Sequence, residues 1–359
     1  MAAVHLATAL RHHGFASDVL ALTKGADDLG VEVLDQRAGL ISSVLDLRRR
    51  LDRHDIVVAH GSRALPAVAG ATAGTATRFL SLQIGDPRYW ERSTLRRLRV
   101  GAYLKGASAS VVFSDVARLW MLQAHRIPAE RVVVIPNGRS ADHFRVPSSK
   151  ERQRARRLFG ISTATRVVAL VGALSVEKRP VEAAKAVLAQ SNTTLIVAGD
   201  GPQSPALAAL GREHLGRVVL LGAIDDVRPV LWASDAIVLA SLTEGLPGVL
   251  IEAGMCGVPA AAVDVGFVSD IVTASTGTLA GALKELPQAV AAVLDRRQEL
   301  GPAAREHCAN RFEMEHVASN WCSVLMSVAK DQSESGNAEK AAGSLQAGGR
   351  ENLGMAESS

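Results

Sequence analysis

One stretch of the chain places a buried strand, a tight turn and a short helix in succession, and this order restricts the fold more than any other feature. Ala236 to Ala240 is an apolar run that predicts a buried strand. Pro247 suits the first position of the helix, where its missing N–H costs no hydrogen bond. Gly257 predicts the end of that helix, and residues 258–260 begin the next strand. This order indicates a parallel sheet.

Two carboxylates lie at the predicted start of this helix. Glu244 belongs to the turn, and Glu252 lies inside the helix. The free N–H groups of Gly248 and Val249 would attract phosphate, as helix N-termini do. Glu252 could accept two hydrogen bonds from a vicinal diol such as a ribose. Either glutamate alone is typical of a solvated loop or helix face, so the interpretation depends on their spacing.

The alternation of strand and helix continues on both sides of this stretch. After a first helix that ends at Gly14, strands are predicted at residues 17–22, 55–60, 77–82, 109–113, 131–135, 167–171, 194–198 and 218–221. A polar segment at 145–153 indicates a linker, and helices are expected at 281–300 and 303–327. The order favours an α/β fold with doubly wound parallel sheets.

Composition excludes several classes of protein. A chain of 359 residues is long enough for two domains, and 48% hydrophobic residues with 21% charged residues is ordinary for a packed protein. The net charge of +4 is too small to indicate a nucleic-acid binder. Three cysteines without metal-ligand spacing predict a reducing compartment. Without a signal-peptide pattern or a membrane-length apolar run, we expect a cytoplasmic enzyme, with peripheral contact at the inner face of the cell membrane as an open alternative.

Three further polar residues lie at predicted strand ends or before a helix. His60 ends one strand, Asp86 follows another, and Lys178 ends a glycine-led loop after the strand at 167–171. Each has a structural alternative, namely packing for His60, a turn cap for Asp86 and a solvated helix start for Lys178.

The segment from Arg88 to Lys105 is predicted to be a strongly basic helix with interleaved aromatic and apolar residues. Such a run of charge is usually a solvated face. The alternative is a surface for anionic lipid headgroups or for an anionic acceptor.

The stretch from Ser241 to Pro259 resembles the Glu-x7-Glu motif of retaining glycosyltransferases with the GT-B fold, specifically family 4 (glycosyl transferases group 1). The resemblance extends from the start of the chain to about Lys330 and includes the turn Gly199-Asp-Gly-Pro202. It implies two Rossmann-like, doubly wound parallel-sheet domains that face a cleft, with a C-terminal helix that crosses back to the first domain.

The resemblance also implies domain boundaries. We expect an acceptor domain at 1–142, a nucleotide-sugar-binding domain at 143–310 and a crossover helix at 311–330. Residues 331–359 lose the apolar period and are expected to be a disordered tail. Members of the family usually open with a strand and a glycine-rich turn, whereas this sequence begins at the helix that follows them. Either the true start lies upstream, or the first domain lacks its first strand.

Residue roles follow from the resemblance. Glu244 and Lys178 would be catalytic, while His60 and Asp86 are acceptor or cleft candidates. Donor-binding residues would be Ile224, Asp226, Leu246, Gly248, Val249 and Glu252.

Two positions depart from the family pattern. Ala173 replaces an arginine that faces the donor diphosphate in the family, and residues 266–270 match the family's Gly-Gly-x-Pro-Glu run weakly. These departures keep an alternative open: a truncated or degenerate, non-catalytic homologue that binds nucleotide sugar.

The expected function is retaining transfer of a sugar from a nucleotide diphosphate sugar to an acceptor hydroxyl, in glycan, polysaccharide or glycolipid biosynthesis. No Asp-x-Asp pair or His/Cys cluster is present, which predicts metal-independent chemistry with no cofactor besides the donor substrate. The expected partners are a nucleotide sugar and a glycan or lipid-linked acceptor, and not nucleic acid.

Overall fold

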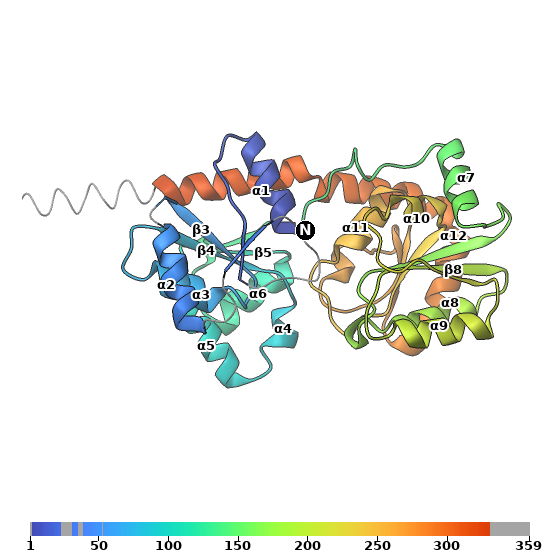
Figure 1. Ribbon diagram of the computed structural model, residues 1–359, viewed down its shortest axis with the longest axis horizontal. Helices are drawn as coiled ribbons and strands as arrows, with labels where there is room; N and C mark the ends of the chain where they lie inside the picture. Colours follow the sequence, from blue (N-terminus) through green and yellow to red (C-terminus); the bar gives the residue numbers. More distant parts are fainter. Residues whose placement is uncertain (1, 23–30, 35–38, 52, 331–359) are drawn as a thin grey trace, which may run out of the picture.

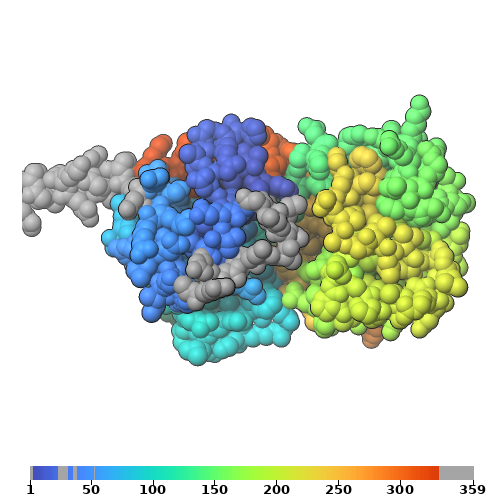
Figure 2. Space-filling view, in the orientation of Figure 1, coloured from blue at the N-terminus to red at the C-terminus, as the bar shows by residue number. Residues whose placement is uncertain are grey.

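Two parallel sheets form the framework of the protein (Figure 1). The computed structural model describes residues 2–22, 31–34, 39–51 and 53–330. The predicted disordered tail therefore lies outside the described residues. In the space-filling view, the blue-to-cyan residues of the first sheet and the green-to-yellow residues of the second form two lobes (Figure 2). Parallel strands connected through helices confirm the predicted α/β class.

The first sheet has four parallel strands in the order β3-β4-β5-β6. Their bounds are Ile56–His60, Arg78–Gln83, Ala109–Val112 and Val132–Val134. The helices of this part are α1 (Ala2–His12), α2 (Leu40–Leu51), α3 (Leu65–Thr72), α4 (Pro87–Trp90), α5 (Thr94–Leu104) and α6 (Asp115–Ala124). A separate parallel pair joins β1 (Leu20–Ala21) to β2 (Glu32–Val33). The strand predicted at 17–22 is thus present but shorter.

The second sheet has six parallel strands in the order β12-β11-β10-β7-β8-β9. In chain order, β7 to β12 cover Arg166–Val171, Thr193–Ala198, Val218–Leu220, Ala236–Leu239, Ala260–Val263 and Gly277–Ala280. The helices are α7 (Ser149–Leu158), α8 (Pro180–Leu188), α9 (Ser204–Glu213), α10 (Arg228–Ala233), α11 (Gly248–Met255) and α12 (Leu286–Phe312). Every residue of β8, β10 and β11 is buried, because helices cover both faces of the sheet.

The predicted linker at 145–153 is partly helical. Ser148 and Glu151 form a capping box that starts α7, which accounts for the early helix. Arg152 and Arg156 of this helix each lie 2.7 Å from a carboxylate oxygen of Asp235, immediately before β10. The segment therefore braces the second sheet.

The C-terminal helices differ from the prediction. We expected a break between 300 and 303, but α12 continues through Pro302 to Phe312. Burial of Leu300 and Ala304 within α12 offsets the hydrogen bond that proline removes. The helix is interrupted instead at Glu313, and residues 314–330 are helical again.

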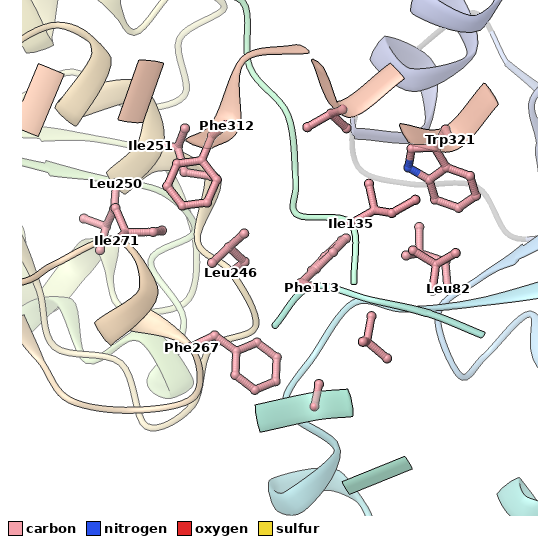
Figure 3. Packing of buried hydrophobic residues seen from close by; sticks show 14 of the residues in the cluster. Leu82, Phe113, Ile135, Leu246, Leu250, Ile251, Phe267, Ile271, Phe312 and Trp321 are labelled. Atoms are coloured by element: carbon pink, nitrogen blue, oxygen red, sulfur yellow. The ribbon is translucent and has the colours of Figure 1, made fainter. Parts of the chain in front are cut away.

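This last helix crosses back to the first sheet, as the resemblance implies. Val317, Trp321 and Leu325 are buried in the same core as Leu82 of β4 and Ile135, which directly follows β6. Figure 3 shows Trp321 above Leu82 and near Ile135. The chain thus passes between the two sheets twice, once after β6 and once at Glu313.

The two passages are joined by backbone hydrogen bonds. The N–H of Arg139 donates to the Phe312 carbonyl at 2.8 Å, and the N–H of Met314 donates to the Arg139 carbonyl at 2.9 Å. The two connecting segments therefore form one short parallel bridge between Arg139 and Glu313.

Candidate functional site

The start of α11 is the point from which the candidate site extends. The helix begins at Gly248, and Pro247 is the extended residue before it, with φ −68° and ψ 111°. The predicted start is thus wrong by one residue, a usual uncertainty at helix ends. Cys256 caps the other end, and Gly257 follows with φ +74°, the left-handed conformation that favours glycine.

Glu244 and Lys178 lie together beside this helix. Lys178 Nζ lies 2.7 Å from Glu244 Oε1, and the Ser241 hydroxyl donates to the same oxygen at 2.6 Å. The Glu244 side chain is only 7% exposed, so the ion pair compensates a largely desolvated charge. No described residue donates a hydrogen bond to Oε2, which leaves that oxygen available to a ligand.

The position of Lys178 is set by close backbone packing. A Cβ at Gly199 would overlap the Gly172 carbonyl, and one at Gly201 would crowd the backbone of Leu174. The N–H of Leu174 donates to the Asp200 carbonyl at 2.9 Å. The Gly199–Pro202 turn therefore fixes the loop that ends in Lys178.

The same loop is attached to the turn that holds Glu244. The N–H of Leu242 donates to the Glu177 carbonyl at 2.8 Å, next to the Lys178 side chain. Arg179, which follows Lys178, has φ +49°, an uncommon conformation for a residue other than glycine. Backbone contacts thus hold both charged residues before any ligand binds.

Glu252 forms an ion pair with Arg139, which was not among the predicted site residues. Arg139 Nε lies 2.5 Å from Glu252 Oε1, and the two side chains are 11% and 15% exposed. The guanidinium also donates from Nη1 to Asn137 Oδ1 at 3.0 Å and to the Gly138 carbonyl at 2.8 Å. A Cβ at Gly248 would overlap Nη2, so Arg139 lies directly against the first turn of α11.

Loops from the two sheets meet beside Glu244. A Cβ at Gly245 would overlap the carbonyl of Ile84, which follows β4 of the first sheet. A Cβ at Gly266 would overlap the Glu244 carbonyl, and Gly266 has φ +60°. Leu246 faces Phe113 across this junction (Figure 3), and both belong to the same core as Phe267.

Asp86 acts as a helix cap. Its carboxylate accepts the Arg88 N–H at 2.9 Å and the Arg88 Nε–H at 3.0 Å, and it is buried. Arg88 Nη2 also donates to the Gly266 carbonyl of the second sheet's loop at 3.1 Å. The structural alternative for Asp86 is therefore realised, while a contact with substrate stays a prediction.

His60 lies at the carboxyl end of β3, as the sequence pattern predicts, while its role at the cleft stays a prediction. Burial lowers the pKa of its imidazole to about 4, so the ring is neutral near neutral pH. A neutral imidazole can accept or donate one hydrogen bond, but no charge is available there for a phosphate.

The remaining donor-binding candidates are distributed around α10 and α11. Asp226 accepts the Arg228 N–H at 2.9 Å and pairs with its guanidinium, which lowers the pKa of the carboxyl. Ile224 and Val249 are half-buried against the core, and Leu246 is buried. Their side chains contribute packing, so any contact with a nucleotide would come from their backbone groups.

Sequence reasoning missed Arg139 and Ser241. Arg139 lies near the end of the predicted acceptor domain at 1–142. No pattern in the sequence indicates that this side chain reaches Glu252.

Within the described residues, no group of three or more His, Cys, Asp or Glu side chains could hold a metal ion. None of the described helices has the length and apolar character needed to span a membrane.

Comparison with known proteins gives a consistent picture. Residues 165–296 match the family described as Glycosyl transferases group 1. The chain is 30% identical over 244 residues to a 2-deoxystreptamine glucosyltransferase of Streptomyces kanamyceticus, covering 64% of this chain and 60% of that protein. It is 28% identical to a D-inositol 3-phosphate glycosyltransferase of Mycolicibacterium smegmatis, covering 71% of this chain and 60% of that protein. The matched region thus spans little more than half of these relatives.

Solved structures share the fold at low sequence identity. Anabaena HepE in complex with UDP superimposes with a TM-score of 0.78 at 22% identity, covering 91% of this chain and 96% of that one. Sucrose-phosphate synthase from Thermosynechococcus elongatus gives a TM-score of 0.77 at 19% identity, covering 90% and 91%.

Proposed function

Since residues 165–296 belong to the group 1 glycosyltransferases and the chain has the GT-B fold, we propose that this protein transfers a sugar from a nucleotide diphosphate sugar to an acceptor hydroxyl. Structures of the similar Anabaena HepE with UDP and with UDP-glucose support a nucleotide-sugar donor. The observation that carries the proposal is the ready-made cluster of Lys178, Glu244 and Ser241 beside the N-terminus of α11.

The proposed donor lies along the first turn of α11. Its diphosphate meets the N–H groups of Gly248 and Val249, where the helix dipole favours negative charge. Its ribose lies at Glu252, whose carboxylate accepts hydrogen bonds from the diol. Its sugar lies at Glu244, where Oε2 accepts a hydrogen bond from a sugar hydroxyl.

The proposed reaction retains the configuration at the anomeric carbon. The bond from that carbon to the diphosphate oxygen breaks, and the acceptor oxygen attaches on the same face of the sugar. The acceptor proton passes to the departing phosphate oxygen, so no separate base is needed. Lys178 and the start of α11 stabilise the charge on the leaving group, and the Glu244 carboxylate stabilises positive charge on the sugar.

We propose glycan or lipid-linked acceptors, and contact of the first lobe with an anionic membrane. The basic segment forms two helices rather than the single one predicted, since α4, which Asp86 caps, ends at Trp90 and α5 begins at Thr94. Trp90, Leu95 and Leu98 are 43%, 75% and 67% exposed among the arginines of this segment. A hollow of about 510 Å³ is lined by Trp90 and Leu95 together with Tyr89, Arg92, Ser93, Arg96 and Arg99. Exposed apolar groups among arginines suit the headgroup region of an anionic bilayer.

The test uses the protein with UDP-, GDP- and ADP-sugars, first measuring release of free nucleoside diphosphate and then transfer to glycan and lipid acceptors. Release that is lost in both Glu244→Gln and Lys178→Met would support the enzyme. Nucleotide binding without release from any donor would favour the non-catalytic alternative. That alternative rests on Ala173, where the family has an arginine, and on the weak match of residues 266–270 to the family's pattern.

A further inference from the structure

Arg139 is placed where a bound nucleoside diphosphate would pass. The side chain extends from the segment after β6 to Glu252, one turn along α11 from Gly248. Its Nη2 lies against Gly248 at the first residue of the helix, where only a glycine leaves room for it. The guanidinium therefore contacts Glu252, the proposed ribose-binding residue, and lies next to the proposed position of the phosphates.

Three hydrogen bonds fix the orientation of this guanidinium. Nε donates to Glu252, and Nη1 donates to Asn137 and to the Gly138 carbonyl. Nη2 donates none of these three bonds, and it lies against Gly248 at the start of the helix. A planar guanidinium held on two sides is pre-organised for an anion on the third.

The backbone of Arg139 is fixed relative to the second sheet. Its N–H donates to the Phe312 carbonyl at the end of α12, and α12 packs against α11. Although Arg139 follows the first sheet in the sequence, these bonds tie it to the donor-binding half. These bonds therefore hold the backbone of Arg139 at the end of α12, the helix that packs against α11.

The two glutamates of the site are each paired with one cation. Lys178 is paired with Glu244 and Arg139 with Glu252, so loss of the Arg139 charge would leave Glu252 unpaired. Ala173 adds no charge at the position where the family has an arginine. A diphosphate entering a site with net negative charge would be repelled.

We propose that Arg139 is a donor-binding residue, which holds Glu252 toward the ribose and pairs through Nη2 with the diphosphate, in place of the charge that Ala173 lacks. This inference rests on the proposed function, because it assumes that the nucleotide lies along the first turn of α11. It also explains why position 248 is glycine, since any side chain there would displace the guanidinium.

The test compares a nucleoside diphosphate with its own nucleoside by calorimetry. UDP, GDP and ADP are screened with the unmodified protein, and the tightest is used with its nucleoside. Arg139→Gln keeps a donor for Glu252 but removes the charge. We expect it to weaken diphosphate binding by at least about tenfold while nucleoside binding changes by less than about threefold. Arg139→Lys, which keeps the charge but loses the planar group, should restore part of the difference.

The outcomes separate this inference from the proposed function. An unchanged ratio of the two affinities in Arg139→Gln would overturn the role of Arg139, and so would tighter diphosphate binding, which would mean that the guanidinium competes with the nucleotide. Nucleoside binding that survives Glu252→Ala unchanged would instead refute the ribose site on which both proposals rest. Thermal melting of each variant checks that it is folded. If Arg139→Gln does not fold, Arg139→Lys is compared with the unmodified protein instead.

Discussion

Arg139 Nε and Glu252 Oε1 lie 2.5 Å apart although 113 positions separate the two residues in the chain. The pair joins the segment that leaves the first sheet to the helix that carries the proposed donor site. It places a cation from one half of the chain next to a carboxylate of the other, within a mostly buried contact. The ion pair therefore ties the connecting segment after β6 to helix α11.

Glu252→Ala should weaken nucleoside binding by roughly 1.5–3 kcal/mol, the scale of a hydrogen bond to a charged group. The loss should be smaller for the nucleoside diphosphate, because Arg139 is then free to turn fully toward the phosphates. Calorimetry with both ligands measures the two losses. An affinity for the nucleoside that is unchanged in Glu252→Ala would contradict the proposed role of Glu252 in ribose binding.

Lys178→Met should reduce turnover by about 10²–10³, the usual effect of removing one group that stabilises charge in the transition state. Nucleotide release from the donor, followed at saturating donor concentration, gives this number directly. Lys185→Met is the matched control, since Lys185 is exposed on the following helix α8. Equal losses in the two variants would show that general surface charge, and not the position of Lys178, matters.

Transfer should persist in excess chelator. Lys178 and the N-terminus of α11 would carry out the charge stabilisation that a divalent cation provides in other transferases. The assay compares initial rates with and without EDTA after dialysis. Activity that disappears in EDTA and returns with magnesium or manganese would contradict the proposed stabilisation of the leaving group by Lys178 and α11.

His60 should make the stability of the fold depend on pH. Its pKa of about 4 in the folded state lies below the ordinary 6.5, so the unfolded chain binds the proton more tightly. Its contribution to stability is full above about pH 6.5 and is lost as the pH falls toward 4. Urea unfolding across this range should show a flatter pH dependence in His60→Asn than in the parent or in the control His12→Asn. An NMR titration midpoint of the His60 ring near 6.5 would contradict the shift.

Leu95→Ser combined with Leu98→Ser should weaken binding to vesicles that contain anionic lipid, because both side chains project into solvent among arginines. Sedimentation with anionic and neutral vesicles provides the comparison. Leu215→Ser is the control, since Leu215 is 83% exposed but lies on the other lobe. If the double variant and the control bind alike, the segment is an ordinary solvated face.

The fold was largely predictable because its strands are continuous apolar runs separated by helices. β7, β8 and β10 match the predicted ranges closely, since burial on both faces requires apolar residues throughout. The resemblance to GT-B glycosyltransferases and the crossing of the last helix are confirmed. Helix limits were less predictable, because packing around Pro302 overrides the local signal for a break.

The site was predictable only where a residue lies within a local motif. Glu244, Gly248 and Glu252 belong to one stretch, so their proximity follows from a strand, a turn and a helix. The partner of Glu252 comes from a distant segment whose sequence has no periodic pattern. Only the folded arrangement of both connecting segments brings Arg139 to that helix, so no reasoning from spacing could identify it.

The paired connections at Arg139 and Glu313 mean that the halves of this protein are not contiguous units of sequence. The helix at 314–330 buries Trp321 against the first sheet but is covalently attached to the second. A fragment that stops after β6 would expose the surface which that helix covers. Expressing the first half alone would require grafting the helix on or adding it as a separate peptide. A circular permutation that opens the chain between Phe312 and Met314 would make each half continuous, with a single connection after β6 left between them.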